Sequence, residues 1–281
     1  MKLALSFALW QLSLLALTAL PAVADLGDAK AFAVLNTGGA LNFGSGDVVG
    51  KPASVTGATC PAGTGCAIYV GGTTVTREST DTIDALTNTD VAPAATDARN
   101  YSAFLSSLKP TQSRNAIVVR PGFGITLKTV GGLNVFAIPS IALGNAMPPN
   151  ATLAIPRVAD PCGAPGRPAQ ITLVGTNEDT AIFNIGTPDK PGALVLCGGS
   201  TIRLSGGITP DRVTFNVAGK GLVALGSSVS AYGTILAPGS SFVSENSPAQ
   251  HAALVDGALI AGGSHVTIGN SFTVRFDPSK L

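Results

Sequence analysis

Short runs of alternating apolar and polar residues, each preceded by a glycine, dominate the second half of the chain. Successive side chains of a strand face opposite ways, so residues two positions apart share a side. In "STIRL" the apolar pair on one side is Ile202 and Leu204, and in "SHVTI" it is Val266 and Ile268. The preceding glycine permits a corner that other residues resist. The pattern Gly-[Ser/Thr]-[Ser/Thr/His]-[Val/Ile/Phe] begins at Gly72, Gly199, Gly226, Gly239 and Gly263.

Two of these units repeat in register. The stretch "GTILAPGSSFVSENS" at 233–247 is followed 24 residues later (257 − 233) by "GALIAGGSHVTIGNS" at 257–271. Recurring strand-and-corner units favour a β-solenoid, in which each coil stacks on the next. The interval is 13 residues from Gly226 to Gly239 and 24 from Gly239 to Gly263, so we expect an irregular solenoid. A β-sandwich gives the same local signals, but repeats matched in register favour the solenoid.

One stretch, residues 81–109, has the periodicity of a helix instead. Its apolar positions recur at spacings of four, three, four and three, which predicts an α-helix at about 93–108, capped by Thr89 or Asp90. The segments "TILA" and "ALIA" are apolar on both strand faces, so one face needs a cover that this helix supplies. The predicted fold is therefore all-β with one long helix: an irregular single-stranded β-solenoid with an α-helix packed along one face. The helix residues on the apolar side are Ala94, Ala98, Tyr101, Leu105 and Leu108, and we expect Tyr101 and Leu105 to be largely buried.

The first 24 residues have the pattern of a secretory signal peptide, with Lys2, an apolar stretch and the small residues 22–24 before Asp25. A membrane anchor is the alternative, but the small-residue cleavage pattern disfavours it, and no later stretch is long and apolar enough to span a bilayer. We expect residues 25–281 to form a single domain that is secreted or held at the cell surface.

Charge excludes one class of partner. Beyond the signal peptide the chain has 16 basic and 16 acidic residues, since Lys2 is one of its 17 basic residues. A neutral chain with so few charges has no electrostatic footprint for nucleic acid.

The even number of cysteines in an exported chain predicts disulfides. Three pairings are possible, and the short turn-rich loop "CPAGTGC" favours Cys60–Cys66, which leaves Cys162–Cys197. Zinc is disfavoured because no paired CxxC pattern is present and the histidines are distant. The sequons at Asn100 and Asn150 matter only in a eukaryotic host, and Asn100 on a partly buried helix would be a poor acceptor.

Candidate catalytic residues are few. Glu78, Asp81 and Asp84 precede the predicted helix, where acidic residues suit the helix dipole, and Glu178-Asp179 lies in a turn composition. His251 and His265 are far apart and no nucleophile motif accompanies them, so neither a triad nor a cofactor site is indicated. Paired carboxylates for glycoside cleavage remain possible, because distances in the fold cannot be read from the sequence.

The order of several segments resembles a known family. "DLGDAKAFAVLNTGGALNFGSGDVVG", the predicted helix, "GGLNVFAIPSIAL", "TAIFNI", "DRVTFNVAG", "VSAYGTILAPGSSF" and "VDGALIAGGSHVTIGNSFTVRF" follow in turn. This series is similar to the choice-of-anchor A domain, an adhesive domain of exported and surface-anchored bacterial proteins. More loosely, it resembles the DUF3494-type ice-binding domain, which implies an irregular β-solenoid with a helix alongside. The chain ends at "RFDPSKL" without a sorting segment, so we expect free secretion or loose surface association, and the final SKL is a chance match to the peroxisomal address.

The resemblance implies no catalytic residues, and three functions follow in order of preference. The first is a non-enzymatic, adhesin-like protein that binds an extended repetitive surface of matrix, glycan or protein. The second is ice binding, and the third is a polysaccharide-active β-helix enzyme. Ice binding requires a flat, charge-free face, and Arg203 and His265 interrupt the outward positions after the corners. The possible binding face consists of Thr74, Thr76, Thr201, Ser228, Ser230, Ser241 and Thr267.

Overall fold

The computed structural model describes residues 26–38, 40–43, 46–48, 58–60, 66–69, 88–145, 168–244, 252–269 and 272–276. The predicted signal peptide, the histidine at 251 and the acidic residues at 78, 81 and 84 lie outside this part of the chain. Four further predicted residues also lie outside it: Thr74, Thr76, Asn150 and Cys162.

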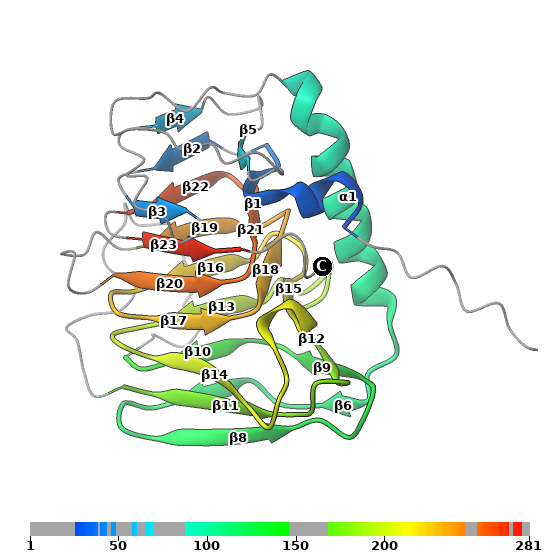
Figure 1. Cartoon of the computed structure of the whole chain (residues 1–281), viewed down its shortest axis with the longest axis vertical. Helices are drawn as coiled ribbons and strands as arrows, with labels where there is room; N and C mark the ends of the chain where they lie inside the picture. The colour runs from blue at the N-terminus through cyan, green and yellow to red at the C-terminus, as the bar shows by residue number, and fades with distance from the viewer. Residues whose placement is uncertain are drawn as a thin grey trace, which may run out of the picture.

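Three mostly parallel sheets form the sides of a β-solenoid, as predicted (Figure 1). Sheet A consists, in spatial order, of β5 (Cys66–Tyr69), β1 (Phe32–Asn36), β21 (Leu259–Ala261), β18 (Thr234–Ala237), β15 (Val213–Val217), β12 (Thr180–Ile185), β9 (Leu133–Ile138) and β6 (Gln112–Ser113). Sheet B consists of β4 (Ala58–Cys60), β2 (Ala40–Phe43), β22 (His265–Ile268), β19 (Ser241–Ser244), β16 (Leu222–Leu225), β13 (Ala193–Leu196), β10 (Ile141–Leu143) and β7 (Ile117–Val119). Sheet C consists of β3 (Gly46–Val48), β23 (Phe272–Arg275), β20 (Ala253–Asp256), β17 (Ser230–Tyr232), β14 (Thr201–Ser205), β11 (Gln170–Val174) and β8 (Gly124–Lys128).

From β6 onward each coil passes through sheets A, B and C in turn, and each of these strands pairs in parallel with its equivalent in the next coil. Side chains that point inward therefore stack in columns. Phe183 pairs in register with Phe136 below it and Phe215 above it. Their rings stack with centroids 4.7 and 5.0 Å apart, and all three are buried. Such columns fill the interior and exclude water from it.

The coils differ in length because their corners differ, and the corner from sheet C to sheet A is one that varies. Gly233 alone separates β17 from β18, whereas residues 206–212 separate β14 from β15 and include a 3-10 turn, η2 (Pro210–Arg212). The tight corner requires glycine, since Gly233 has φ 137°. A Cβ at Gly257, one coil on, would lie 2.5 Å from the backbone of Gly233. The corner from sheet A to sheet B varies as well, because residues 139–140 separate β9 from β10 and residues 186–192 separate β12 from β13.

The stack does not follow the order of the chain. The first coil, β1 to β3, pairs in parallel with the last coil, β21 to β23, as in the pairing of Val34 with Leu259. On the outer side of the first coil, β5 and β4 pair antiparallel with β1 and β2. The chain then crosses to the opposite end of the stack and continues at β6 (Figure 1).

The long helix α1 (Asn88–Ser107) makes this crossing along the outside of sheet A (Figure 1). It begins five residues before the predicted start, and it contacts β12, β15 and β18. Ala94, Ala98 and Leu105 are buried as their spacing predicts. Tyr101 is only half-buried, contrary to the prediction, because the buried face of the helix is centred on Ala98, Ser102 and Leu105 and Tyr101 lies at its edge, stacked on Phe104. No helix in the described residues combines the length and apolar character that crossing a membrane requires.

Polar side chains join the helix to the sheet. Asn216 in β15 donates hydrogen bonds to the carbonyl oxygen of Ser102 at 3.1 Å and to the side chain of Asn184 at 2.8 Å. The Ser102 hydroxyl donates to Asn216 Oδ1 at 2.6 Å, and Asn184 donates to the carbonyl oxygen of Leu105. These bonds fix the position of the helix along the stack. Asn100, which we expected to be a poor glycan acceptor because the helix is partly buried, is exposed.

A short 3-10 helix, η1 (Gly27–Ala31), precedes β1 and packs against α1. The backbone N–H of Asp28 donates to the Asp97 carboxylate at 2.9 Å, and Arg99 donates to the carbonyl oxygen of Thr37. These contacts anchor the helix to the first coil.

Candidate functional site

Of the three faces, sheet A is covered by the helix. Its outward column includes Asn184, Asn216, Leu236, Ile260 and Leu35, and all five are buried. A ligand with an extended surface could reach this face only by displacing α1. Sheets B and C are therefore the candidate binding faces.

The described outward side chains of sheet B are small or apolar apart from that of His265. One column follows the pairing of β7 with β10, β13, β16, β19 and β22, and a second runs beside it over β13, β16, β19 and β22. None of their described members is an aspartate, glutamate, lysine or arginine. The first column is Val118, Ala142, Val195, Ala224, Val243 and Thr267, and the second is Ala193, Leu222, Ser241 and His265.

Much of this face is out of contact with solvent. Ala142 and Ala224 are 1% and 0% exposed, although both point away from the solenoid interior. Ala193, Val195 and Ala224 form a small apolar cluster with Cys197, which is fully buried and disulfide-bonded. The described side chains do not identify the partner of Cys197, so the predicted pairing with Cys162 stays a prediction.

The solvent-facing part of sheet B lies on β19 and β22. Ser241, His265 and Thr267 are half-exposed there. The hydroxyls of Ser241 and Ser264 are 2.9 Å apart, and Ser264 Oγ lies 2.9 Å from His265 Nδ1. No described carboxylate orients the imidazole, so this chain of polar groups lacks the third member of a catalytic triad.

Sheet C, in contrast, is charged. Its outward positions include Lys128, Arg203, Asp256 and Arg275. Asp256 and Arg275 form an ion pair at 3.5 Å across neighbouring strands. A charged side chain holds its own hydration shell, so this face is unsuited to ordering water into a lattice.

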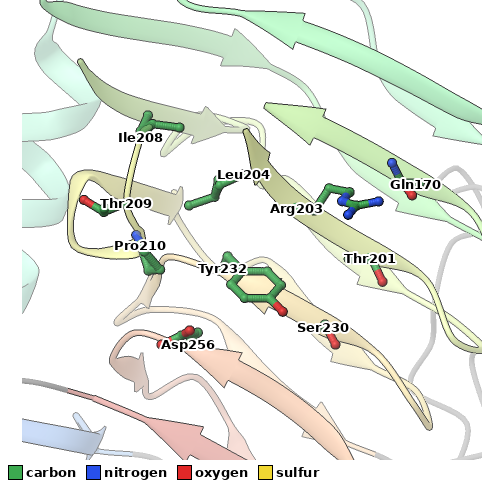
Figure 2. A pocket seen from close by; sticks show the side chains of 10 residues that line it. All are labelled: Gln170, Thr201, Arg203, Leu204, Ile208, Thr209, Pro210, Ser230, Tyr232 and Asp256. Atoms are coloured by element: carbon green, nitrogen blue, oxygen red, sulfur yellow. The ribbon is translucent and has the colours of Figure 1, made fainter. Parts of the chain in front are cut away.

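A shallow groove of about 600 Å³ crosses sheet C (Figure 2). The residues of its floor come from four neighbouring strands, and the corner at 206–212 forms one side of it. Tyr232 lies in the middle of Figure 2, between Arg203 and Asp256. The lining residues are Gln170, Thr201, Arg203, Leu204, Ile208, Thr209, Pro210, Ser230, Tyr232 and Asp256.

The residues predicted as one binding face are divided between two faces. Thr201 and Ser230 pair on sheet C, whereas Ser241 and Thr267 lie on sheet B. Ser228 lies in neither sheet, because it occupies the turn between them with φ 57°. The described residues of the predicted binding face therefore do not share one face of the solenoid.

The reason is that one sequence pattern marks two different corners. Gly199 and Gly226 precede the corner from sheet B to sheet C, whereas Gly239 and Gly263 precede the corner from sheet A to sheet B. The uneven intervals between these glycines reflect this change of corner. Sequence reasoning also missed Tyr232 and Asp256. The alternation in "SAY" indicated that Tyr232 points outward, but nothing local placed the loop at 206–212 beside it.

Asp179 is a structural residue, as its turn composition suggested. Its carboxylate accepts hydrogen bonds from the Thr129 hydroxyl at 2.6 Å and from the backbone N–H of Thr176 at 2.7 Å. The bond from Thr129 is the main reason that the pKa of Asp179 is lowered. In the described residues, no three histidine, cysteine or acidic side chains cluster in a way that could hold a metal ion.

Comparison with solved structures identifies the architecture. No family model matches the chain, and no curated protein matches it in sequence. An ice-binding protein from the Antarctic ascomycete Antarctomyces psychrotrophicus superposes with a TM-score of 0.55 at 20% identity, over 89% of this chain and 97% of that one. The fold is that of ice-binding β-solenoids.

Two further solved structures agree. An ice-binding protein from an Arctic yeast gives a TM-score of 0.54 at 15% identity, with 90% and 94% of the two chains covered. One from an Antarctic biological consortium gives 0.52 at 14% identity, with 90% of each chain covered. At these identities the likeness concerns the fold. The looser of the two predicted resemblances is supported at that level, and the match to choice-of-anchor A is not.

Proposed function

We propose that the chain is an exported, non-enzymatic ice-binding protein and that sheet B carries its ice-binding surface. The observation that carries this proposal is that the solvent-facing positions described on β19 and β22 hold no aspartate, glutamate, lysine or arginine, and His265 is the one titratable side chain among them. The parallel strands of a sheet repeat about every 4.8 Å, so rows of small side chains on them can hold water at regular intervals. The ice-binding proteins of the same fold add support. Export rests on the predicted signal peptide.

Ice would contact the solvent-facing part of this sheet. Ser241, His265 and Thr267 lie there on adjacent strands, and their described neighbours Leu222 on β16 and Val243 on β19 are apolar. Their strands, β19 and β22, each pair in parallel with a strand on both sides, which restrains the backbone that carries them. A stiff surface loses little conformational freedom when it binds, which favours adsorption to a crystal.

The adhesin-like function preferred from the sequence receives no support from these comparisons, because the neighbours are described as ice-binding proteins. The polysaccharide-active enzyme is disfavoured as well. Glycoside hydrolysis normally uses two carboxyl groups, and Asp256 is the only carboxylate among the described residues that line the sheet C groove.

The test is thermal hysteresis of the purified residues 25–281, with Thr267→Tyr compared with Thr201→Tyr. Both threonines are half-exposed on strands, but one lies on sheet B and the other on sheet C. We expect hysteresis in the parent protein, its loss in Thr267→Tyr, and its retention in Thr201→Tyr. Both variants should unfold within about 0.5 kcal/mol of the parent, as surface substitutions do.

A parent protein without hysteresis or inhibition of ice recrystallisation would contradict the proposed function. Loss of hysteresis in Thr201→Tyr alone would contradict the assignment to sheet B.

A further inference from the structure

We propose that the groove on sheet C is a second binding site, which takes a strand of acidic polysaccharide with Arg203 holding a carboxylate and Tyr232 packing against a sugar ring. This site is independent of the proposed ice-binding surface, because it lies on a different sheet. It is built from the described residues on β11, β14, β17 and β20 and from the corner at 206–212.

The shape of the groove suits an extended chain. Adjacent strands are about 4.8 Å apart, similar to the length of one hexose in an extended polysaccharide. A sugar chain that runs across the strands therefore meets one strand per residue. The first row of side chains it would meet is Gln170, Thr201 and Ser230, which pair in register. A small enclosed ligand would need a deeper pocket than this open one.

The wall of the groove is particular to one coil. At the corner between sheets C and A, the following coil turns through Gly233 alone, whereas residues 206–212 bulge outward. Thr209 and Pro210 from this bulge line the groove beside Tyr232 (Figure 2). The groove thus has a side that a plain solenoid face lacks.

The chemistry of the floor suits sugar hydroxyls. Tyr232 presents an aromatic ring, on which the C–H face of a sugar can pack, together with a phenolic hydroxyl. Thr201 and Ser230 add hydroxyls that donate and accept hydrogen bonds. Gln170 donates to Thr172 at 2.7 Å, which fixes its amide and leaves the carbonyl oxygen able to accept a bond.

The charges of the groove select an acidic chain. Arg203 is exposed, and no described residue forms an ion pair with it. Asp256, the one carboxylate of the lining, is already paired with Arg275. The groove therefore offers a guanidinium without a protein counter-charge, and a guanidinium binds a carboxylate through two parallel hydrogen bonds. A uronate residue supplies that carboxylate.

Calorimetric titration of residues 25–281 with alginate oligosaccharides, and with cello-oligosaccharides of the same length, tests this site. We expect binding of the alginate and a much weaker response to the neutral sugar. Arg203→Gln should weaken alginate binding by about tenfold or more, as removal of a charge-assisted pair does. Tyr232→Ala should weaken it as well.

The matched control is Lys128→Gln, which removes a positive charge from the same sheet outside the groove. It should change affinity by less than about twofold, because an exposed charge at a distance is screened by salt. An equal loss in Lys128→Gln would mean unspecific attraction of a polyanion and would overturn the site, as would the absence of alginate binding. Equal affinity for the neutral sugar would overturn the role of Arg203. Thermal hysteresis should be unchanged in Arg203→Gln, so this proposal and ice binding fail separately.

Discussion

Asp179 joins two neighbouring coils at the corner between sheets C and A. Its side chain is buried, and its carboxylate accepts hydrogen bonds from Thr129 of one coil and from the backbone of Thr176 in its own. These bonds favour the charged form and lower the pKa of Asp179 below its ordinary value of 3.8. The charged form is thus the one that stabilises the folded chain.

The sign of the pH dependence follows from this lowered pKa. The stabilisation is fully present above the unfolded-state pKa and is lost as pH falls through the folded-state value. We expect Asp179→Asn to melt at a lower temperature than the parent at neutral pH, and the difference to shrink below about pH 4. Thermal unfolding followed by circular dichroism from neutral to acid pH measures this. Glu178→Gln, at the exposed neighbouring position, should have no such effect, and a difference independent of pH would count against the interpretation.

Cys197 gives a second prediction at this scale. It is fully buried among apolar side chains of sheet B, and we expect mapping of non-reduced peptides to give Cys162–Cys197 and Cys60–Cys66. Cys60 is the last residue of β4 and Cys66 is the first residue of β5, the next strand along the chain. The longer loop should contribute about 3–4 kcal/mol and the shorter about 2–2.5 kcal/mol. A Cys60–Cys162 bond would contradict both assignments.

Helix α1 covers the outer face of sheet A and keeps it out of contact with solvent. Leu105 is 1% exposed against the sheet, whereas Ala103, two residues earlier, is exposed to solvent. Leu105→Asp should lower the free energy of unfolding by about 3 kcal/mol or more, because it buries an unpaired charge. Ala103→Asp should change it by no more than about 0.5 kcal/mol. Urea denaturation compares the two variants, and equal effects would mean that the helix does not pack through Leu105.

Some features of the helix and strands could be predicted from the sequence, and others could not. The spacing of Ala94, Ala98 and Leu105 gave the buried side of the helix, because helical periodicity is a local signal. Asn184 and Asn216 could not be recognised as helix contacts, since a polar residue in an alternating strand indicates a solvated face. The binding face could not be predicted for a similar reason. Ser241 and Thr201 follow the same corner pattern, and only the course of the chain places them on different sheets.

At the scale of the whole molecule, the solenoid could be predicted and the order of its coils could not. Repeats such as 233–247 and 257–271 are adjacent in the chain and in space, so their common register was visible. The pairing of β1 with β21 joins segments near opposite ends of the described chain and leaves no periodic pattern. The two candidate sites depend on which sheet carries their residues, and not on the order in which the coils are stacked.

The stacking of the first coil on the last determines the order in which the molecule can be assembled. Val34 and Leu259 are 225 residues apart (259 − 34), and closing a loop of that length costs about 5 kcal/mol of chain entropy. Synthesis makes β1 to β3 first, yet their partners β21 to β23 are made last. The first coil must therefore wait, unpaired on that side, until the chain is almost complete. A chain that stops short of β21 leaves β1 without its parallel partner, so premature termination damages the beginning of the protein as well as its end.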